Sequence, residues 1–522
     1  MASIRKWLSH PAALVLLGLF VWLPVGVLIA LGRFDGLYGQ DPYAYYDYAI
    51  GPLRASLLAG QPFPPFFWPP GYPLLVALAS FVLGLTPLAG QCVSLIAGGL
   101  VPTFTALLVR EVWPANDETE RMTIAWVAGL VTALTGQLWQ SSAVVMSDTT
   151  GLAAATLGVW ATARYGRRAQ PVWLLLASGA LAWALLTRWI YGLVALPAAI
   201  FALWVMVRRG IPALLQHGVA AALVGGLILS PLLFSIASRA QSSFTGDLEV
   251  YSWSPLNAFQ REFVTLDGRL SYPLPNGLYY ALAPAHRYYF TPLLALLILP
   301  GMWVVARRRA FAPLLLLAGW AALVYGFHAG APWQNFRFAL AYLPPLAGLA
   351  AIGWASALSR CTPLGLPAGR LETGQGVREK FRPFVNSWLI IGWVAMAFGG
   401  FQLTQSFIDR KAHDLELVRR VEALLPPQAR LLTFSLTLTF QHYSVLETIE
   451  LFDLSPADAA SLLTDGRPTF LLVDVGNIET QWHDERLGQT YRWLRDGPGL
   501  EQIDGLGAYT LFRVRSVEGG FP

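Results

Sequence analysis

The sequence predicts a polytopic α-helical membrane protein with about eleven transmembrane helices, followed by a small C-terminal α/β domain. The chain has 522 residues, of which 55% are hydrophobic and only 13% are charged, whereas soluble domains carry about 25% charged residues. Apolar runs of about 17–25 residues, the length that a helix needs to cross a bilayer, recur through residues 1–408. Residues 409–522 are instead charged and contain short strand-like runs.

The apolar runs follow one another along the chain with few long interruptions. We place the spans at residues 11–32, 89–109, 123–145, 150–165, 171–187, 190–207, 214–237, 289–306, 311–328, 338–358 and 386–407. The first run is too long for the core of a signal peptide, and no small-x-small cleavage site follows it, so we expect a retained anchor. The run at 71–85 is short, and counting it as a span would invert every later loop. We therefore predict a re-entrant or interfacial helix there.

Basic residues decide the orientation, because cytoplasmic loops are enriched in Lys and Arg. In the order of these spans, the basic clusters fall on one side: Arg5 and Lys6, Arg110 and Arg121, Arg164 to Arg168, Arg208 and Arg209, Arg307 to Arg309, and the 360–382 loop. We expect the first outer loop, 33–88, and residues 409–522 on the opposite, extracytoplasmic side. Arg410 and Lys411 argue mildly against that assignment. The net charge of +5 needs no nucleic-acid partner, because the basic residues flank spans and do not alternate with aromatics.

The C-terminal residues show strand and helix patterns. ARLLTFS, TIELFD, TFLLVDV and AYTLFRV are typical of strands, and DLELVRRVEALL and SPADAASLL are amphipathic stretches that suit helices. His442, Asp453, Asp474 and His483 of this region are expected to be surface or loop residues. The two cysteines, Cys92 and Cys361, are expected in a helix and an inner loop respectively, so we predict no disulfide.

The first outer loop combines three carboxylates with many aromatic rings, in RFDGLYGQDPYAYYDYAIGPLRASLLAGQPFPPFFWPPGYPLL. Asp35, Asp41 and Asp47 are six residues apart, and we expect them on roughly one face if residues 41–59 are helical. Pro42 favours Asp41 at or near the N-cap of that helix. Asp41 is therefore either a capping residue in a solvated loop or a carboxylate free to face a cavity.

A further acid, Asp148 in SAVVMSDTTGLAAATL, falls where an outward span meets the next inward one. Ionisable residues at membrane depth are rare and tend to be functional. The alternative is that Ser147 or Asp148 caps the following helix. Because Asp41 and Asp148 are both expected on the outer side, the two acids can share a pocket.

Four arginines are expected at the outer ends of spans: Arg54, Arg188 in LLTRWIYGL, Arg287 in PAHRYYF, and Arg337 in PWQNFRFALAYLPPL. Arginine forms bidentate bonds to phosphate, so a cluster here would hold a lipid phosphate. Any single one of them equally suits snorkelling to the interface or stacking on an aromatic ring. We expect at least one of the four to bind phosphate.

Common enzyme signatures are missing. The chain has no Walker-type phosphate loop, no G-x-G-x-x-G followed by a helix, no H-E-x-x-H and no G-x-S-x-G elbow. The sequence therefore shows no nucleotide-binding motif that could drive transport. A flippase or transporter of an amphiphilic, lipid-linked substrate is an alternative, although it would require ionisable residues deep in the spans and symmetry between two halves. A non-catalytic lipid- or glycan-binding scaffold is another.

In order as well as type, these segments resemble the GT-C superfamily of polytopic glycosyltransferases, especially the bacterial relatives of protein O-mannosyltransferases and lipid A aminoarabinose transferases. The resemblance covers roughly residues 11–358. It rests on DPYAYYDYAIGPLRASLLAGQPF, WPPGYPLLVAL, VVMSDTTGLA, ALLTRWIYGLVALP and FRFALAYLPPLAGL. It implies a polyprenyl-phosphate-linked sugar as donor and a lipid, glycan or protein acceptor outside the cytoplasm, at the plasma (inner) membrane.

The resemblance also implies roles. Asp41 matches the catalytic acid of the first loop, Asp148 matches the acid of the second outer loop, and Arg337 occupies the position of an Arg–aromatic pair before a Pro-rich span. Sugar transfer needs a carboxylate that accepts the acceptor's proton and positive charge for the leaving phosphate. We give the latter role to Arg337, with Arg188, Arg287 and Arg54 as further substrate-binding candidates. Tyr43, Tyr45, Tyr46, Trp68 and Tyr72 would supply ring faces and hydroxyls for the sugar and the prenyl chain.

The first loop departs from the family in one respect. Many relatives have an Asp-Glu pair there, whereas Pro42 follows Asp41 in this chain. We therefore assign no metal ligands and leave a divalent cation open, and Asp35 and Asp47 stay alternatives to Asp41 as the base. The resulting hypothesis is an inverting glycosyltransferase with its active site on the outer face of the membrane.

Overall fold

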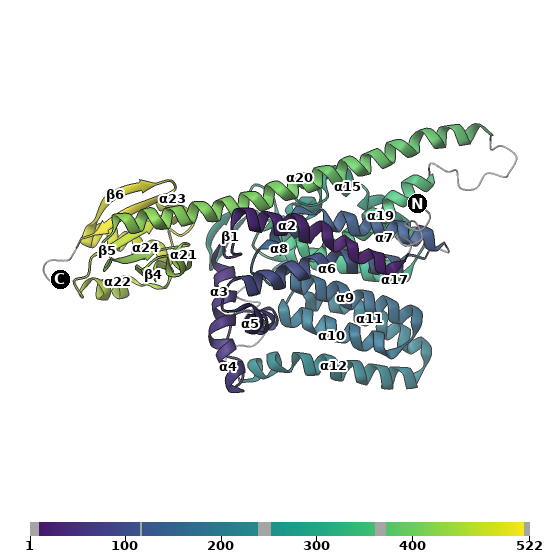
Figure 1. The fold of residues 1–522 in the computed structure, drawn as a ribbon, viewed down its shortest axis with the longest axis horizontal. Helices are drawn as coiled ribbons and strands as arrows, with labels where there is room; N and C mark the ends of the chain where they lie inside the picture. Colours follow the sequence, from purple (N-terminus) through teal and green to yellow (C-terminus); the bar gives the residue numbers. More distant parts are fainter. Residues whose placement is uncertain (1–9, 115–116, 239–251, 361–371, 516–522) are drawn as a thin grey trace.

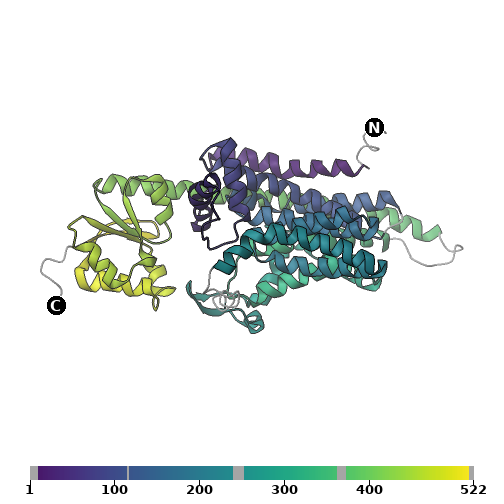
Figure 2. The same ribbon diagram turned by 90° about the horizontal axis from the view of Figure 1, so that it is seen from below.

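The computed structural model describes residues 10–114, 117–238, 252–360 and 372–515. It has a helical body and, at one end, a smaller region built around a β-sheet; one long helix connects the two (Figure 1). A view turned by 90° shows the same arrangement (Figure 2). The long helices of the body run roughly along the long axis of the molecule, so that one end of the body faces the sheet region.

The body is formed mainly by long helices. Those that precede residue 239 are η1 and α2 (Pro11–Gly18, Leu19–Gly32), α6 (Leu88–Val112), α7 (Glu118–Ala133), α8 (Gly136–Ala143), α9 (Asp148–Arg168), α10 (Pro171–Thr187), α11 (Tyr191–Arg209) and α12 (Ile211–Ser238). Those that follow are α15 (Thr291–Ala295), α16 (Ile298–Arg307), α17, η5 and α18 (Phe311–Pro313, Leu314–Gly319, Trp320–Gly330), α19 (Leu343–Arg360) and α20 (Glu372–Leu424). Cys92 lies in α6 with a free thiol, and Cys361 lies outside the described residues.

Seven helical segments among the described residues are long and apolar enough to cross a membrane, and an eighth is added if α7 and α8, which meet at a bend of 57°, form one broken span. The other three predicted spans correspond to α9, to α10 with 17 residues, and to the short apolar stretch Thr291–Arg307. The chain is a multi-pass membrane protein, but the predicted number of eleven spans is not confirmed.

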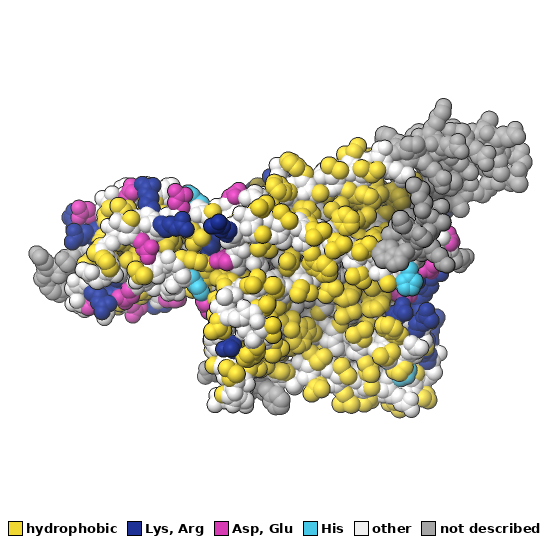
Figure 3. Space-filling model, in the orientation of Figure 1, with side chains coloured by type: hydrophobic (Ala, Val, Ile, Leu, Met, Phe, Trp, Pro, Cys, Tyr) yellow, Lys and Arg dark blue, Asp and Glu magenta, His cyan; other side chains and the backbone are white. Residues whose placement is uncertain are grey.

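Side-chain types divide the surface of the body. Hydrophobic side chains cover most of the face shown in Figure 3, and Lys and Arg gather at the end away from the sheet region. The basic residues belong to the last turns of α6, α9, α11 and α16: Arg110, Arg167, Arg168, Arg208, Arg209 and Arg307. This surface is typical of a protein whose body lies in a bilayer.

Shorter elements occupy the end of the body that faces the sheet region. The segment after α2 forms α3 (Gln40–Tyr48), the π-helical turn η2 (Ala49–Leu53), α4 (Arg54–Ala59) and α5 (Gly71–Leu83). The segment before α15 forms η3 (Pro255–Phe259), a hairpin of β1 (Glu262–Thr265) and β2 (Gly268–Ser271), α14 (Asn276–Leu282) and η4 (Ala283–Ala285); η6 (Phe336–Tyr342) precedes α19. At about 1.5 Å per residue, the 13 residues of α5 are too few to cross a bilayer.

The C-terminal sheet region contains five strands in the order β4-β3-β5-β7-β6. β3, β4 and β5 are parallel, and β7 runs antiparallel to β5 and β6. Its elements are β3 (Arg430–Thr433), α21 (Thr437–Tyr443), β4 (Glu447–Glu450), η7 (Leu451–Asp453), α22 (Pro456–Leu463), β5 (Thr469–Val473), α23 (Val475–Thr480), α24 (Arg486–Leu494), η8 (Arg495–Gly499), β6 (Leu500–Leu506) and β7 (Tyr509–Val514). The four strands expected from the sequence are present, and β6 is an addition to them.

Side chains alternate across this sheet because successive residues of a strand point to opposite faces. Leu431 packs with Val421 of α20 on one face, whereas Leu432 packs with Leu487 of α24 on the other. The end of α20 thus forms part of the core of the sheet region. Residue 409, where we expect the second domain to begin, lies inside this continuous helix, so the division of the chain at that residue stays a prediction.

Two glycines allow the backbones of α16 and α19 to touch. A Cβ added to Gly301 would lie 1.9 Å from the carbonyl oxygen of Leu349, and one added to Gly353 would lie 1.9 Å from that of Leu297. Small residues serve this purpose at helix contacts in membranes, where close packing of the backbones replaces the hydrophobic effect.

We predict that Gly353→Ala destabilises the helical body, because the obstructing atoms are backbone atoms that cannot turn aside. Overpacking of this kind costs about 1–3 kcal/mol. The measurement is the midpoint of thermal unfolding of the purified protein in detergent. Gly326→Ala is the matched control, since nothing lies within 4 Å of a Cβ added there. Equal midpoints for the two variants would contradict the described packing.

Candidate active site

Polar side chains of α6 hold the connection between α8 and α9, where the site begins. The side chain of Gln91 donates to the carbonyl of Ala143 at 3.1 Å, and the hydroxyl of Ser94 donates to that of Met146 at 3.2 Å. Thr149 in turn donates to the carbonyl of Ser94 at 2.9 Å. Because buried backbone groups need such partners, these contacts fix the start of α9.

Asp148 is the first residue of α9, and its side chain is only 6% exposed. It forms an ion pair with Arg188, which lies in extended conformation directly after α10. Burial by itself lowers the pKa of the Arg188 guanidinium, but the Asp148 carboxylate, together with Tyr45, Tyr191 and Asp41, outweighs this effect and holds the pKa above its ordinary value. A buried charge is tolerated when it is paired, and this ion pair meets that condition.

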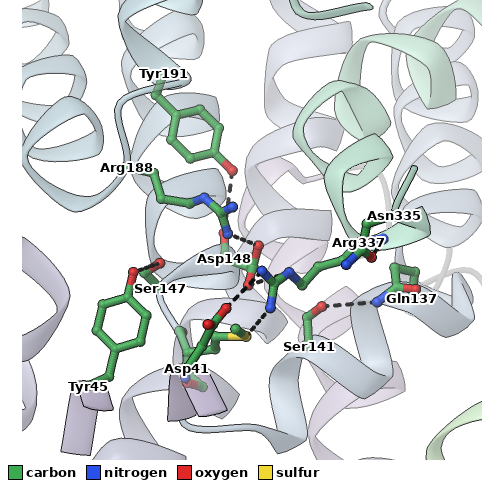
Figure 4. A network of polar contacts seen from close by, with 12 residues as sticks. Asp41, Tyr45, Gln137, Ser141, Ser147, Asp148, Arg188, Tyr191, Asn335 and Arg337 are labelled. Atoms are coloured by element: carbon green, nitrogen blue, oxygen red, sulfur yellow. Dashed lines mark hydrogen bonds and ion pairs between the residues drawn. The ribbon is translucent and has the colours of Figure 1, made fainter. Parts of the chain in front are cut away.

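Arg337 joins this pair to the first loop (Figure 4). It stands at the start of η6, where the side chain of Asn335 accepts a hydrogen bond from its backbone N–H at 2.9 Å. Its Nη2 donates to Oδ2 of Asp41 at 3.0 Å, and its Nε lies 3.9 Å from Oδ2 of Asp148. Its Nη1 contacts the sulfur of Met146 at 3.0 Å. One guanidinium therefore reaches both predicted catalytic acids.

Phe338 supports both arginines of the site. The guanidinium carbon of Arg337 lies 5.6 Å from the centre of its ring, and that of Arg188 lies 5.9 Å from it. Ring faces attract cations at this range. The sequence signal for Phe338 is its position directly after Arg337, and Met146 is likewise two residues before Asp148.

The charged side chains of the cluster differ in exposure, and Arg188, at 23%, is about as exposed as Arg337. The side chain of Asp41 is 36% exposed and that of Arg337 is 22% exposed, against 6% for Asp148. Oδ2 of Asp148 and Nε of Arg337 are buried and form no hydrogen bond within the described part of the chain. Of the two acids, an incoming molecule would therefore meet Asp41 first, with Asp148 behind it.

Asp41 lies near the N-cap of its helix, as expected, but the expected grouping of the three loop acids is corrected. Gly39, with φ of 80°, occupies the N-cap of α3, and Asp41 is the second residue of the helix, so it does not cap it. The three loop acids also do not share one face. Asp47 pairs with His442, and Asp35 accepts from the hydroxyl of Tyr443. At 3.6 residues per turn, a spacing of six rotates the side chain by about 240°, which separates Asp47 from Asp41.

The predicted substrate-binding aromatics pack beside the acids. The ring of Tyr45 stacks on Trp68 at 4.7 Å and meets the edge of Tyr72 at 5.4 Å. Burial raises the pKa of the Tyr45 phenol, so it stays protonated and shares a hydrogen bond of 3.0 Å with Ser147. Tyr46 points away from these rings and donates to the carbonyl of Leu85 at 3.0 Å.

The remaining two arginines lie elsewhere. Arg54 is placed over the ring of Phe81 at 4.6 Å, and Arg287 donates to the hydroxyl of Tyr288 at 2.9 Å. Neither forms an ion pair with a carboxylate among the residues that the structure describes. The structure thus gathers two of the four predicted arginines, Arg188 and Arg337, at the acids.

The residues of the site do not fit a bridging metal ion. No group of three or more His, Cys, Asp or Glu side chains that could hold a metal ion occurs in the described ranges. The guanidinium of Arg337 lies where a cation between Asp41 and Asp148 would lie, and Pro42 takes the place of a further carboxylate. No step of the reaction below is therefore routed through a metal ion.

No model of a known protein family matches the chain, and no curated protein matches it. Solved structures do. ArnT from Cupriavidus metallidurans bound to undecaprenyl phosphate is similar over 99% of both chains, with a TM-score of 0.57 and 15% identity. The apo oligosaccharyltransferase of Archaeoglobus fulgidus is similar over 98% of this chain and 75% of its own, with a TM-score of 0.54 and 12% identity. This chain has their fold. The predicted resemblance to GT-C glycosyltransferases is thereby confirmed at the level of the fold.

We predict that Arg188→Met destabilises the protein by about 3 kcal/mol, because it leaves the buried Asp148 carboxylate without its principal partner. The double variant Arg188→Met/Asp148→Asn should regain part of that loss. The measurement is a double-mutant cycle of unfolding free energies in detergent. Losses that simply add would show that the two side chains do not interact.

Proposed function

We propose that this protein is an inverting glycosyltransferase that moves a sugar from a polyprenyl-phosphate-linked donor to an acceptor hydroxyl outside the cytoplasm. The observation that carries the proposal is the guanidinium of Arg337, which reaches Asp41 and Asp148 at 3.0 and 3.9 Å. A base and a phosphate-binding cation thus stand side by side at the exposed edge of a buried charge cluster. The fold shared with ArnT, which is solved bound to undecaprenyl phosphate, supports the same donor class.

The proposed reaction assigns one role to Asp41 and one to Arg337. The acceptor oxygen attacks C1 of the sugar, the bond between C1 and the phosphate oxygen breaks, and the lipid phosphate leaves with the electron pair. Asp41 accepts the proton of the acceptor hydroxyl. Positive charge stabilises the leaving phosphate better than a proton donor would, because the phosphate leaves as an anion, and this is the role of Arg337.

Two ion pairs prepare the site for this exchange. When the donor phosphate binds Arg337, it competes with Asp41 for the same guanidinium, so that the Asp41 oxygen becomes free to accept a proton. Asp148 stays paired with Arg188 and keeps a negative charge beneath Arg337. It thereby orients the guanidinium, and it adds a fixed charge near the oxocarbenium-like transition state.

The extracytoplasmic location is supported by the two ends of α9. Asp148 begins this helix, and Arg167 and Arg168 end it, which at 1.5 Å per residue separates them by about 30 Å, the thickness of the hydrocarbon core. Since basic ends favour the cytoplasm, the acids would face the outside of the plasma (inner) membrane. We place the C-terminal sheet region on that same side.

Ring faces next to Asp41 suit a sugar. Tyr45 and Trp68 stack on one another beside the carboxylate-bearing helix α3, and Phe67 next to them is 71% exposed. Rings of this kind pack against the apolar faces of sugars and against prenyl chains. We assign Trp68, which is partly exposed, to this contact, and we assign the buried rings of Tyr45 and Tyr72 to its support. Whether the acceptor is a lipid, a glycan or a protein is left to experiment.

We predict that Asp41→Asn abolishes transfer, with a loss of about 10²–10⁴-fold in kcat, because the amide cannot accept the proton. The measurement is transfer from a panel of polyprenyl-phosphate-linked sugars by the purified protein in detergent.

Asp117→Asn is the matched control for that loss. Asp117 also stands at the start of a helix, where it is the N-cap of α7, and it is replaced by a residue that caps equally well. If Asp41→Asn kept full activity, Asp41 would not be the base. Movement of the lipid-linked sugar across proteoliposomes without any transfer would favour a flippase instead.

We predict that Arg337→Met lowers kcat by about 10²–10³-fold, the cost of losing one group that stabilises developing negative charge. Arg337→Lys should recover only part of the activity, because an ammonium group lacks the forked donors of arginine. The same transfer assay measures both, with Arg486→Met as control, since Arg486 is an exposed residue of the sheet region that pairs with Asp458. Full recovery by Arg337→Lys would exclude bidentate binding.

A further inference from the structure

The helix that carries Asp41, α3, makes side-chain contacts on two of its faces. Asp41 and Tyr45, one turn apart, face the charge cluster and Ser147. Tyr43 and Asp47, also one turn apart, face α21 of the C-terminal sheet region. Residues four apart lie on the same side of a helix, so α3 is clamped between the site and the sheet region.

A contact between a histidine and a carboxylate, and a tilted pair of rings, form the first part of this interface. Nε2 of His442 lies 3.0 Å from Oδ1 of Asp47, and the ring of His442 lies 4.9 Å from that of Tyr43. The sequence gives no sign of this contact, since 395 residues separate the paired side chains. His442 is an exposed residue, as expected from the sequence, and it is also a partner of the first loop.

A buried lysine forms the second part. Lys411 of α20 is 3% exposed, its Nζ donates to the hydroxyl of Tyr43, and it lies 3.9 Å from the centre of the Tyr443 ring. The hydroxyl of Tyr443 donates to Asp35. A lysine is rarely buried unless its charge is paired. Here the ammonium group lies close to the rings of Tyr43 and Tyr443, and the carboxylate of Asp35 interacts favourably with its charge. These contacts also account for the presence of Lys411 at the end of the body where few other basic residues occur.

The sheet region also contacts the side of the site that carries Arg337. The side-chain amide of Gln481 donates to the backbone carbonyl of Asp267 at 2.6 Å, and the backbone carbonyl of Gln481 accepts from the backbone N–H of Arg269 at 2.8 Å. These residues belong to the β1–β2 hairpin. The carboxylate of Asp267 accepts from the indole of Trp333 at 2.8 Å, and Trp333 is four residues before Arg337.

We propose that the C-terminal sheet region is a two-point clamp that positions the catalytic groups, through Lys411, His442 and Tyr443 on the Asp41 side and through Gln481 on the Arg337 side. This inference rests on the proposed function. The four are positioning residues, since none of them touches Asp41 or Arg337 among the described contacts. The clamp sets the relation between the base and the phosphate-binding cation, which approach from segments 296 residues apart.

The two contact points should change different kinetic constants. Lys411→Met and Tyr443→Phe loosen α3 and should lower kcat about tenfold, since small misplacements of a reacting group cost up to about 10²-fold, while the KM for the donor stays within about twofold. Gln481→Ala loosens the hairpin and should raise the KM for the donor more than it lowers kcat. A role limited to stability would not separate the two constants in this way.

Hydrogen–deuterium exchange of the whole protein tests the clamp without any need for activity. Lys411→Met should raise exchange of the amides of α3, residues 40–48, by severalfold. Arg420→Met is the control, because Arg420 also lies on α20 but pairs with Asp504 inside the sheet region. It should leave both α3 exchange and transfer unchanged.

Each outcome decides the proposal. Unchanged exchange in α3 would overturn it, as would raised exchange with unaltered kcat, or an equal loss of kcat in Arg420→Met. If Lys411→Met fails to fold, Tyr443→Phe, which removes a single oxygen, tests the proposal by the same two measurements, amide exchange in α3 and kcat. A wild-type protein that transfers no sugar would refute the proposed function, and the exchange experiment would still show whether the sheet region holds α3.

Discussion

The carboxylate of Asp148 is buried between the guanidinium groups of Arg188 and Arg337, and the arrangement of the whole site follows from the need to keep that charge paired. An isolated carboxylate in such surroundings would cost several kcal/mol. Satisfying it brings together the start of α9, the connection between α10 and α11, and η6. These elements are far apart in the chain, so this ionic contact determines which ends of the helices meet.

The same pairing leaves one acid available for chemistry. Two carboxylates and two guanidiniums balance one another in charge, but of the two carboxylates only Asp41 is appreciably exposed, at 36% against 6% for Asp148. In the proposed reaction, an anionic phosphate that approaches the cluster meets the guanidinium of Arg337, whose present partner is Asp41, the proposed base. Binding of the donor phosphate to Arg337 then releases Asp41 to accept the proton of the acceptor hydroxyl.

Much of the fold could be predicted from the sequence, because apolar runs and strand periodicity are local signals. The two acids and Arg337 could be named from their order in the chain.

The grouping of the loop acids was wrong, since a spacing of six does not return to the same face of a helix. The partners of Asp35 and Asp47 could not be predicted at all, because Tyr443 and His442 lie 408 and 395 residues further along the chain. β6 and the β1–β2 hairpin were missed for a related reason: their residues are mostly exposed, and weak alternation marks them poorly.

An experimentally determined structure of the protein with a polyprenyl phosphate bound would test the proposed exchange at Arg337 most directly. We expect the phosphate oxygens to lie within hydrogen-bond distance of the Arg337 guanidinium, with Asp41 released from it and Asp148 still paired with Arg188. A phosphate bound away from Arg337, with the contact between Asp41 and Arg337 intact, would contradict it.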